Sequence, residues 1–566
     1  MHSRYSEGQG LRAGVKFPVK ELLVAASLAT GGGAIVERIA SLGASPSLVV
    51  YAGLYAALAL SLVLAGHIRG AVLRIGCALV LGVSGFVFDA SERIMGDHLN
   101  YDAFINLLNS MGFADDAVAQ HGGLMLGALV GPALLFAGIA LPPRRVSDRV
   151  ARIALAAPVL GVLGLAGILF ARGGEGERGL PGPFVPLAFS ALYGYDSATG
   201  NVGPRQAVTL VPAAVPPARD VVLIVDESVL ATYLDINRPS GVRSGLKDAR
   251  PGVTVVNYGV AAAITNCSVG SNVDLRFGGT RDAYRRINAT MPSIWAYARK
   301  AGFRTVYIDG QRTGGQLQNL MTADEVREID MLVQFDRVAV RDRDMAVADR
   351  LAALLNDGVA QFIFVNKIGA HFPVHDKYPD RLMRYRPALP RGRFRNVGDT
   401  GSRAGFGGAA GEWTLYRNSY RNTLLWNVGA FFDRLLSRAD ASRATMIYTS
   451  DHGQDLHERG RRGVNTHCNV APRPEEGMVP LVVIEGAGLR TLDWSRHHAG
   501  NVDRVSHYGV FPTLLALMGY DPGAVGPLYG PSLADRSTDP GTFNTTFNAR
   551  LGREPIWAGI RQPPAR

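Results

Sequence analysis

Long apolar runs dominate the first third of the 566-residue chain and limit what this part can fold into. A helix needs about 20 residues to cross the hydrocarbon core of a bilayer, and each run is close to that length. Membrane spans are the favoured interpretation, because five such runs in about 150 residues leave little polar surface for a soluble helical bundle. The runs are Leu22–Ile39, Ser47–Ala65, Ala71–Phe88, Gly123–Leu141 and Ile153–Ala171.

Arginine and lysine gather on alternate connections between these runs, and this pattern predicts the orientation. Short basic loops stay on the cytoplasmic side of a membrane. Five crossings then place the N-terminus inside and the C-terminal part outside, with residues 1–172 as the membrane domain. The basic residues are Arg4, Arg12, Lys16 and Lys20 before the first run, Arg69 and Arg74 around the start of the third, and Arg144, Arg145, Arg149 and Arg152 before the fifth.

The net charge of +11 is partly explained by these loop residues. A basic chain can also bind nucleic acid, but the sequence has no zinc-finger, homeodomain or RNA-binding pattern, so we expect no nucleic-acid partner.

The segment 89–120, between the third and fourth runs, contains apolar residues such as Phe104 and Leu108. It is interpreted either as an amphipathic helix on the outer membrane surface or as an ordinary connecting helix.

The remainder of the chain has the pattern of an α/β domain. Residues 173–217 are rich in Gly and Pro and are predicted to be a linker along the outer membrane surface, followed by a soluble domain over residues 218–566. Short β-branched runs alternate there with helical patterns, which indicates a mainly parallel sheet flanked by helices. The predicted strands are Val221–Val225, Val253–Val256, Thr305–Ile308, Phe362–Val365, Thr445–Thr449 and Val479–Ile484, with helices over Pro292–Lys300 and Asp344–Leu355.

Polar clusters follow several of these strands, where ligands of parallel sheets bind. Each cluster alone has a structural explanation, such as a helix cap or a turn. Together they combine carboxylates and imidazoles that suit zinc with hydroxyls at a helix N-terminus that suit a nucleophile carrying a phosphoryl group. The clusters are Asp226-Glu227-Ser228, Thr265–Asn272, Gly369-Ala370-His371, Thr449–Gly453 and Thr466-His467-Cys468.

The chain has three cysteines, which is too few for a disulfide scaffold. Cys77 lies in an apolar run, whereas Cys267 and Cys468 each lie next to a possible catalytic residue. A disulfide between Cys267 and Cys468 would suit an oxidising compartment. Two free thiols remain an equal alternative, because the sequence does not give the distance between their Cα atoms.

Several of these stretches resemble the phosphoethanolamine transferases that modify lipid A, within the alkaline phosphatase and sulfatase superfamily. The resemblance covers almost the whole chain, from the spans through the linker to the soluble domain. It is carried by Val222–Ser228, by Tyr307–Gln311, by Gly369-Ala370-His371-Phe372-Pro373, by Ser450-Asp451-His452-Gly453-Gln454-Asp455-Leu456 and by Ser506–Leu515. It implies an alkaline-phosphatase-like fold for the soluble domain.

The resemblance also implies a reaction and roles for individual residues. Glu227, Ser271, Asp451 and His452 would hold one zinc ion, with a second zinc also possible. Ser271 would be the nucleophile, with Ser268 as its rival. His371 and His467 would bind the transferred phosphoryl group, protonate the leaving group, or help to hold a second metal.

The implied partners are a phospholipid donor, a lipid or glycan acceptor such as lipid A, and the membrane itself. The implied location is the inner membrane of a bacterium, with a cytoplasmic N-terminus and a periplasmic catalytic domain, and a monomer is expected.

Departures from the family pattern keep other functions open. The residue before the metal-binding Glu is Asp226 rather than Gly, and the nucleophile is Ser rather than Thr. One alternative is phosphoglycerol transfer from phosphatidylglycerol, as in lipoteichoic acid synthases, and another is a non-catalytic, membrane-anchored binding protein. Sulfatase activity is not favoured, because Ser268–Asn272 lacks the Pro and the Arg that surround a formylglycine precursor.

Overall fold

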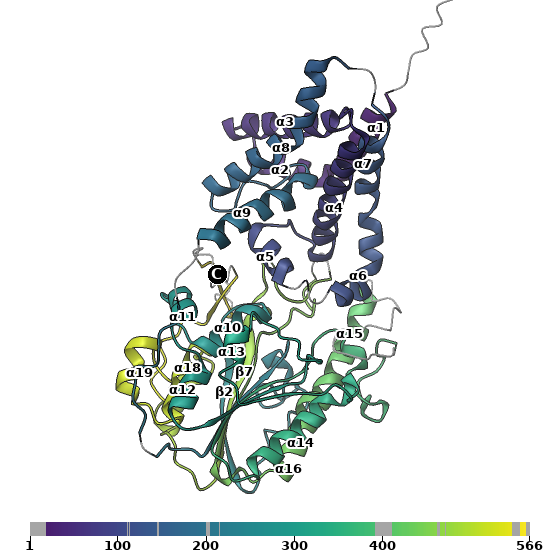
Figure 1. Ribbon diagram of the computed structural model, residues 1–566. Helices are drawn as coiled ribbons and strands as arrows, with labels where there is room; N and C mark the ends of the chain where they lie inside the picture. Colours follow the sequence, from purple (N-terminus) through teal and green to yellow (C-terminus); the bar gives the residue numbers. More distant parts are fainter. Residues whose placement is uncertain are drawn as a thin grey trace, which may run out of the picture. The chain divides into compact units, whose positions relative to one another are not determined.

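The structure is a computed structural model that describes residues 18–109, 111, 114–143, 146–199, 204–213, 215–390, 410–460, 464–469, 471–545 and 555–561. The chain divides into two compact units (Figure 1). The helical unit comprises residues 1–90 and 126–192, and the catalytic unit comprises residues 91–125 and 193–566. The stretch predicted as a linker contains a helix of its own, α9 (Val185–Thr199).

Four helical segments are long and apolar enough to cross a membrane, and a fifth span is broken. The expected first span is two helices, α1 (Val19–Thr30) and α2 (Gly32–Leu42), bent by 61° at Gly31. Glycine is about 1 kcal/mol less favourable than alanine in a helix interior, so the Gly31–Gly33 triplet is a natural breaking point. The other spans are α3 (Pro46–Ala65), α4 (Ala71–Met95), His121–Ala140, which includes α7 (Val130–Ala140), and α8 (Asp148–Ala171).

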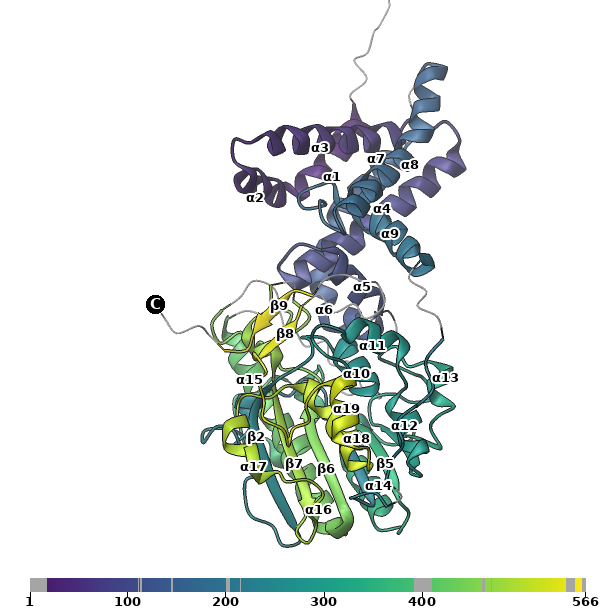
Figure 2. The same ribbon diagram turned by 90° about the vertical axis from the view of Figure 1, so that its left-hand side faces the viewer.

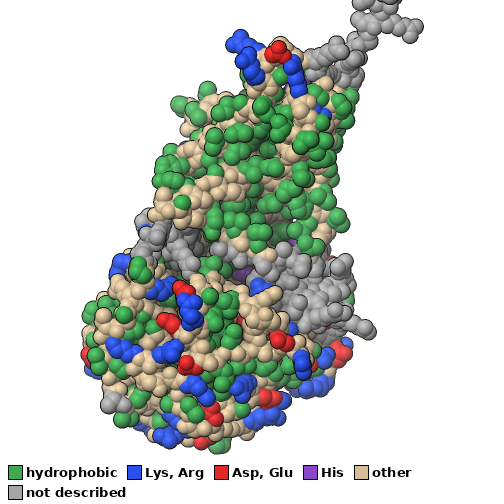
Figure 3. All heavy atoms as spheres, in the orientation of Figure 1, with side chains coloured by type: hydrophobic (Ala, Val, Ile, Leu, Met, Phe, Trp, Pro, Cys, Tyr) green, Lys and Arg blue, Asp and Glu red, His purple; other side chains and the backbone are tan. Residues whose placement is uncertain are grey.

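Apolar side chains cover the surface of the helical unit (Figure 3, green). Val50 on α3 and Val72 on α4 are 71% and 85% exposed. Exposed apolar surface on this scale is unfavourable in water and favourable against lipid tails. The chain is therefore membrane-anchored. Among the basic residues used to predict its orientation, Arg4, Arg12, Lys16, Arg144 and Arg145 lie outside the described residues.

The catalytic unit is built on a seven-stranded sheet in the order β2-β7-β6-β1-β5-β3-β4. β7 is antiparallel to both β2 and β6, and the pairs from β6 through β4 are all parallel. All six predicted strands are present, and the additional one, β4, is a short edge strand. The strands are β1 (Asp220–Asp226), β2 (Val253–Ala262), β3 (Arg304–Asp309), β4 (Met331–Gln334), β5 (Gln361–Asn366), β6 (Ala444–Ser450) and β7 (Met478–Gly486).

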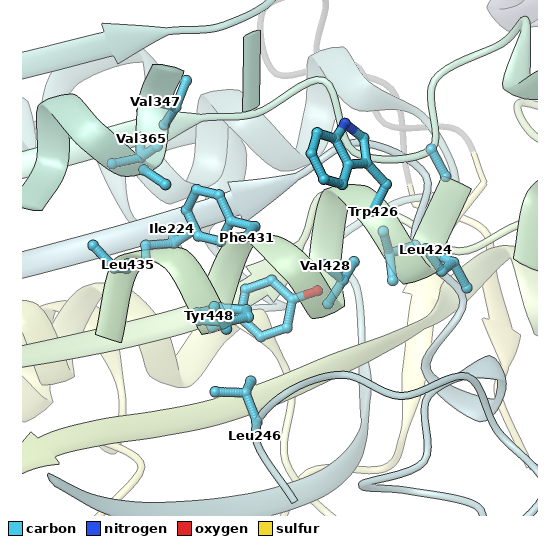
Figure 4. Packing of buried hydrophobic residues seen from close by; sticks show 14 of the residues in the cluster. Ile224, Leu246, Val347, Val365, Leu424, Trp426, Val428, Phe431, Leu435 and Tyr448 are labelled. Atoms are coloured by element: carbon cyan, nitrogen blue, oxygen red, sulfur yellow. The ribbon is translucent and has the colours of Figure 1, made fainter. Parts of the chain in front are cut away.

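Helices cover both faces of this sheet (Figures 1 and 2). On β1, Val222 and Ile224 point into one apolar core and Leu223 into the other. The first core is closed by α14 (Arg343–Leu355), α15 (Ala410–Leu424) and α16 (Phe431–Arg438), as Figure 4 shows for Phe431 and Leu435. The second is closed by α12 (Ile294–Lys300), α18 (Val510–Leu517) and α19 (Pro522–Tyr529). Burial on both faces explains why the central strands are uniformly apolar.

Shorter elements complete the catalytic unit. The helix expected within residues 89–120 is α5 (Tyr101–Asn109), which belongs to this unit and in which Phe104 and Ile105 are buried. The remaining elements are α6 (Ala114–Ala128, which continues into the helical unit), α10 (Ser268–Phe277), α11 (Tyr284–Thr290), α13 (Ala323–Val326), α17 (Ser495–Asn501) and a hairpin of β8 (Thr542–Asn544) and β9 (Trp557–Gly559).

A buried carboxyl on α10 is expected to make stability depend on pH. Burial raises the pKa of Asp274 to about 7, although Asn288 donates a hydrogen bond to it. The folded state therefore keeps a proton that the unfolded state loses above about pH 4, so stability falls as pH rises from about 4 to about 7. Asp274→Asn is expected to remove a slope of up to about 1.4 kcal/mol per pH unit, measured by denaturant unfolding of the full chain.

The exposed neighbour Asp282 provides the matched control for this prediction. Asp282→Asn should keep the wild-type slope. Identical slopes in the wild type and Asp274→Asn would show that Asp274 is ionised in the folded protein throughout this range.

Candidate active site

Three of the predicted metal ligands meet at one edge of the sheet. Glu227, Asp451 and His452 each offer a ligand atom, and these atoms all lie within 4.8 Å of one another. Glu227 follows β1, whereas Asp451 and His452 follow β6. The two strands are parallel neighbours that pair Asp226 with Ser450, so the next residues of both strands emerge side by side.

The ring of His452 is oriented as in a metal ligand. Its Nδ1 atom lies 2.7 Å from the carbonyl oxygen of Gly453. A carbonyl can only accept a hydrogen bond, so Nδ1 carries a proton and Nε2 is the ring atom directed at the cluster, 3.2 Å from Glu227 Oε1. Metal-binding histidines are commonly fixed by such a bond to a backbone carbonyl.

Asp451 is anchored through one oxygen and presents the other. Its Oδ1 atom accepts hydrogen bonds from the backbone N–H groups of Ser228, at 3.0 Å, and His452, at 2.8 Å. Its Oδ2 atom is buried and has no hydrogen-bond partner among the described residues. Two carboxylates, an imidazole and a nearby hydroxyl form a donor set that suits tetrahedral zinc. The residues present therefore fit a zinc ion.

The three side chains also perturb one another's protonation. Burial opposes ionisation of Glu227, but its hydrogen bond with His452 and the charge of that ring hold the pKa of Glu227 well below its usual range. Burial and the charge of Glu227 raise the pKa of Asp451 to about 8. Burial alone would lower the pKa of His452, but Asp451 and Glu227 raise it to about 9. Perturbed, mutually dependent groups of this kind are typical of functional sites.

Two hydroxyls contact this cluster: that of Ser228 donates to Glu227 Oε1 at 2.8 Å, and that of Ser268 contacts both Glu227 and His452. Ser268 is the first residue of α10, and its Oγ atom lies 3.2 Å from each carboxylate oxygen of Glu227 and 3.1 Å from His452 Nε2. The unpaired N–H groups at the start of α10 create a positive potential that favours an anionic phosphoryl group.

Ser271, the residue expected as nucleophile and zinc ligand, lies one turn further along α10. Its side chain is fully buried, and its hydroxyl donates to the carbonyl oxygen of Thr265 at 3.3 Å. The helix begins at Ser268, so Ser268 is the serine at the open end and Ser271 lies behind it. The structure thus joins Ser268, and not Ser271, to Glu227 and His452 by hydrogen bonds.

His371 and His467 both lie near the cluster. The rings of His467 and His452 are stacked, with centroids 4.5 Å apart. Burial, and then the positive charge of His452, lower the pKa of His467 to about 3, so this ring is neutral. His371 donates from Nδ1 to its neighbour's carbonyl oxygen at 2.5 Å, and its charge contributes to lowering the pKa of Glu227.

A disulfide joins two parts of the site. Cys267, the N-cap of α10, is bonded to Cys468, and their Cα atoms are 4.9 Å apart. The backbone N–H of Cys468 also donates to the carbonyl oxygen of Asn266 at 2.9 Å. Of the two alternatives left open by the sequence, a disulfide or two free thiols, the structure contains the disulfide. This bond ties the segment that carries His467 to the start of the helix that carries Ser268.

A buried ionic network lies behind the cluster and was not predicted. Lys367 Nζ is 2.7 Å from Asp226 Oδ1, and both side chains are inaccessible to solvent. Lys367 also donates to the carbonyl oxygen of Asn427, within the π-helical turn Leu425–Ala430, and Asn427 donates to Gly369. π-Helical turns inside α-helices occur frequently at functional sites.

The same network fixes the loop that leads to His371. Asp344 accepts hydrogen bonds from the backbone N–H groups of Ile368, at 2.9 Å, and Gly369, at 3.0 Å. Gly369 has φ +53°, and a Cβ atom there would lie 2.6 Å from the carbonyl oxygen of Glu227. Only glycine fits this close approach, which sets the loop directly against the backbone of a metal-site residue.

Another histidine, His121, comes from a part of the chain that precedes the predicted α/β domain. His121 on α6 belongs to the catalytic unit, and its charge is among those that lower the pKa of His467. No strand or motif in the sequence connects His121 with this site.

Loss of one carboxylate ligand is expected to weaken zinc binding. Asp451→Asn keeps an oxygen that can accept the two backbone hydrogen bonds but removes the negative charge, so zinc affinity should fall at least about 100-fold. Elemental analysis of purified protein after dialysis measures the bound zinc. Asp349→Asn, at a surface ion pair with Arg434, is the control. Equal zinc content in Asp451→Asn and wild type would exclude Asp451 as a ligand.

The fold and the site together define an alkaline-phosphatase-like domain: a mainly parallel sheet covered by helices, with metal-binding groups at the strand ends. The Sulfatase family model matches residues 219–520, more than half of the chain, and the chain belongs to this family.

Two solved structures have folds similar to this chain. The integral membrane lipooligosaccharide phosphoethanolamine transferase A (EptA) of Neisseria meningitidis is 17% identical, with a TM-score of 0.65, over 92% of this chain and 98% of EptA. The C-terminal periplasmic domain of EptC from Escherichia coli, in complex with zinc, is 17% identical, with a TM-score of 0.50, over 64% of this chain and 98% of that domain. No curated protein matches the chain. At this identity the likeness establishes the fold, which includes the membrane helices in the case of EptA.

Proposed function

We propose that this chain transfers a phospho-alcohol head group, phosphoethanolamine in the first instance, from a phospholipid to an envelope lipid or glycan such as lipid A. The observation that carries the proposal is the position of the Ser268 hydroxyl, at the N-terminus of α10 and against Glu227 and His452. It is supported by a protein of the same fold that is named for phosphoethanolamine transfer, EptA of N. meningitidis, and by the periplasmic domain of E. coli EptC, which has the same fold and was solved in complex with zinc.

In this proposal, Glu227, Asp451 and His452 hold one zinc ion beside Ser268. Bound zinc supplies a Lewis acid that favours loss of the hydroxyl proton at neutral pH. The chain itself orients the nucleophile, because Ser268 donates its hydrogen bond to the ionised Glu227. The buried Asp226–Lys367 pair and the Cys267–Cys468 disulfide limit the movement of these groups.

The proposed reaction has two half-reactions. After losing its proton to solvent, Ser268 Oγ forms a bond to the head-group phosphorus, and the bond from phosphorus to the diacylglycerol oxygen breaks. His371 protonates that oxygen, and diacylglycerol leaves. The acceptor hydroxyl then attacks the same phosphorus and gives its proton to His371, and the bond to Ser268 breaks. Neutral His467 donates a hydrogen bond to the phosphoryl group, and the kinetics should be ping-pong.

The catalytic unit is proposed to work in the periplasm, anchored in a bacterial inner membrane with the N-terminus in the cytoplasm. The distribution of basic residues between the spans supports this orientation. The disulfide next to Ser268 supports it independently, because disulfides persist in oxidising compartments and are rare in the cytosol.

The experiment that tests the proposal is mass spectrometry of lipids and envelope glycans from cells with and without this protein. A gain of phosphoethanolamine on one acceptor, absent with Ser268→Ala, would support it. A gain of phosphoglycerol would assign phosphatidylglycerol as the donor and correct the head group. No gain on any lipid or glycan would contradict the proposed transfer and favour a binding protein.

A further inference from the structure

A basic hollow of about 250 Å³ lies in the catalytic unit, apart from the Ser268 cluster. It is formed by α17, by the stretch that follows this helix and by the loop around Ser537. α17 lies beside β2 (Figure 2), and His498 on α17 contacts the carbonyl oxygen of Asn257 at 2.8 Å. The polar residues that line the hollow include Ser495, Arg496, His497, Arg504, Arg536 and Ser537, and none of its described lining residues is acidic.

The arginines of this hollow form no close ion pair, although Arg496 interacts electrostatically with the exposed Asp493 nearby. Within the described part of the chain, the side chains of Arg496, Arg504 and Arg536 form no ion pair and no hydrogen bond, and all three residues are exposed. Other arginines of the unit are paired; for example, Arg434 contacts both carboxylate oxygens of Asp349 at 2.6 Å. Like charges held together without counter-ions repel one another, so a bound anion would offset this cost.

The acidic residues nearest in sequence to these arginines form hydrogen bonds with other groups. Asp493 Oδ1 accepts a hydrogen bond from the Ser495 hydroxyl at 2.7 Å. Asp535 Oδ2 accepts one from the Ser532 hydroxyl at 2.8 Å, and Asp503 Oδ1 accepts one from the Val260 N–H at 2.7 Å. None of these carboxylates lines the hollow, so its lining keeps a net positive charge.

The floor of the hollow is rigidly built. Asn501 is only 1% exposed, and its Nδ2 atom donates to the carbonyl oxygens of Leu533, at 3.2 Å, and Asp535, at 2.7 Å. Its Oδ1 atom accepts the backbone N–H of Ser537 at 2.9 Å. The Ser537 hydroxyl in turn donates to the carbonyl oxygen of Arg504. The backbones that carry the arginines are thus held together before any ligand binds, which reduces the entropy cost of binding.

We propose that this hollow is a binding site for a phosphate monoester group. Guanidinium groups match the geometry of phosphate oxygens, and a phosphate monoester offers three strong acceptor oxygens and close to two negative charges. The guanidinium groups of the three arginines supply enough donors for such a group. The volume lies below the roughly 300–1,000 Å³ of pockets that enclose drug-sized ligands, so a head group fits and a whole lipid does not. The inference does not depend on the transfer reaction.

The test compares phosphate binding by the full chain, in a zwitterionic detergent, with binding by the double variant Arg504→Gln/Arg536→Gln. Isothermal titration with inorganic phosphate forms one arm, and titration with short-chain phosphatidic acid forms the other. Both proteins keep the Glu227 cluster, so their difference reports the hollow alone. Arg490→Gln is the control, because Arg490 is exposed and does not line the hollow.

We expect binding to weaken at least about tenfold in the double variant and to be unchanged in Arg490→Gln. Arginine-dependent binding of inorganic phosphate would assign a free phosphate group as the ligand. Arginine-dependent binding of phosphatidic acid alone would assign a lipid head group. Indistinguishable titrations of wild type and double variant in both arms would overturn the proposal.

Discussion

Replacing Ser268 with alanine is expected to abolish head-group transfer, by at least about 10³-fold, and to leave the fold and the zinc site in place. Among the described residues, Ser268 is the hydroxyl that contacts both Glu227 and His452, and loss of a nucleophile typically removes most of an enzyme's rate enhancement. Glu227, Asp451 and His452 remain, so zinc content should stay close to that of the wild type. The measurement is transfer of a labelled head group from phospholipid to acceptor by purified full-length protein.

Ser271→Ala is the matched control for this prediction, because it makes the same change one turn along the same helix. Ser271 makes one hydrogen bond, to the carbonyl oxygen of Thr265, and such a bond contributes only about 1 kcal/mol to stability. We therefore expect Ser271→Ala to retain activity within about tenfold of the wild type. Full activity in Ser268→Ala together with an inactive Ser271→Ala would return the nucleophile to Ser271.

Lys367→Met is expected to destabilise the catalytic unit by about 3–5 kcal/mol, because it leaves the buried Asp226 carboxylate without its counter-ion. The methionine keeps the length of the side chain, so the effect reports lost charge rather than lost volume. The melting temperature of the full chain, followed by near-ultraviolet circular dichroism, should fall by roughly 10 °C. Activity should fall as well, since Asp226 directly precedes Glu227.

The double variant Asp226→Asn/Lys367→Met separates the ion pair from general damage to the core. Removing both charges should recover much of the lost stability, with a coupling energy of at least about 1 kcal/mol. Lys300→Met, an exposed lysine in the same unit, should change stability by less than about 0.5 kcal/mol. Purely additive effects of the two single substitutions would show that the pair is not coupled in the folded protein.

Much of the fold could be predicted because its signals are local. The central strands are buried on both faces, so they form continuous apolar runs, and the residues after β1 and β6 could be assigned to the sheet edge that holds the site. β4 has only four half-buried residues at the sheet edge, too short and too mixed a run to identify. The bend at Gly31 was missed because apolar length predicts a span but does not reveal its angle.

The rest of the site depends on tertiary structure. Which serine faces Glu227 and His452 depends on where α10 begins. An error of one turn in the expected start of this helix would replace Ser268 with Ser271 as that serine. Lys367 could not be identified because a lysine after a strand is usually exposed; its burial becomes intelligible only with Asp226 and Asn427 in place. The Cys267–Cys468 pairing spans 201 residues, and the sequence could name it only as one of two equal alternatives because it does not give the distance between the Cα atoms. His121 comes from a distant helix and leaves no pattern in the sequence.

The most direct test of the central claim is mass spectrometry of the purified, zinc-loaded full chain after incubation with phosphatidylethanolamine and no acceptor. Covalent transfer through Ser268 predicts a mass gain of one phosphoethanolamine on the peptide that contains Ser268, which disappears when acceptor is added. The gain should be absent in Ser268→Ala and present in Ser271→Ala. An adduct on another residue, or turnover without any adduct, would contradict the account.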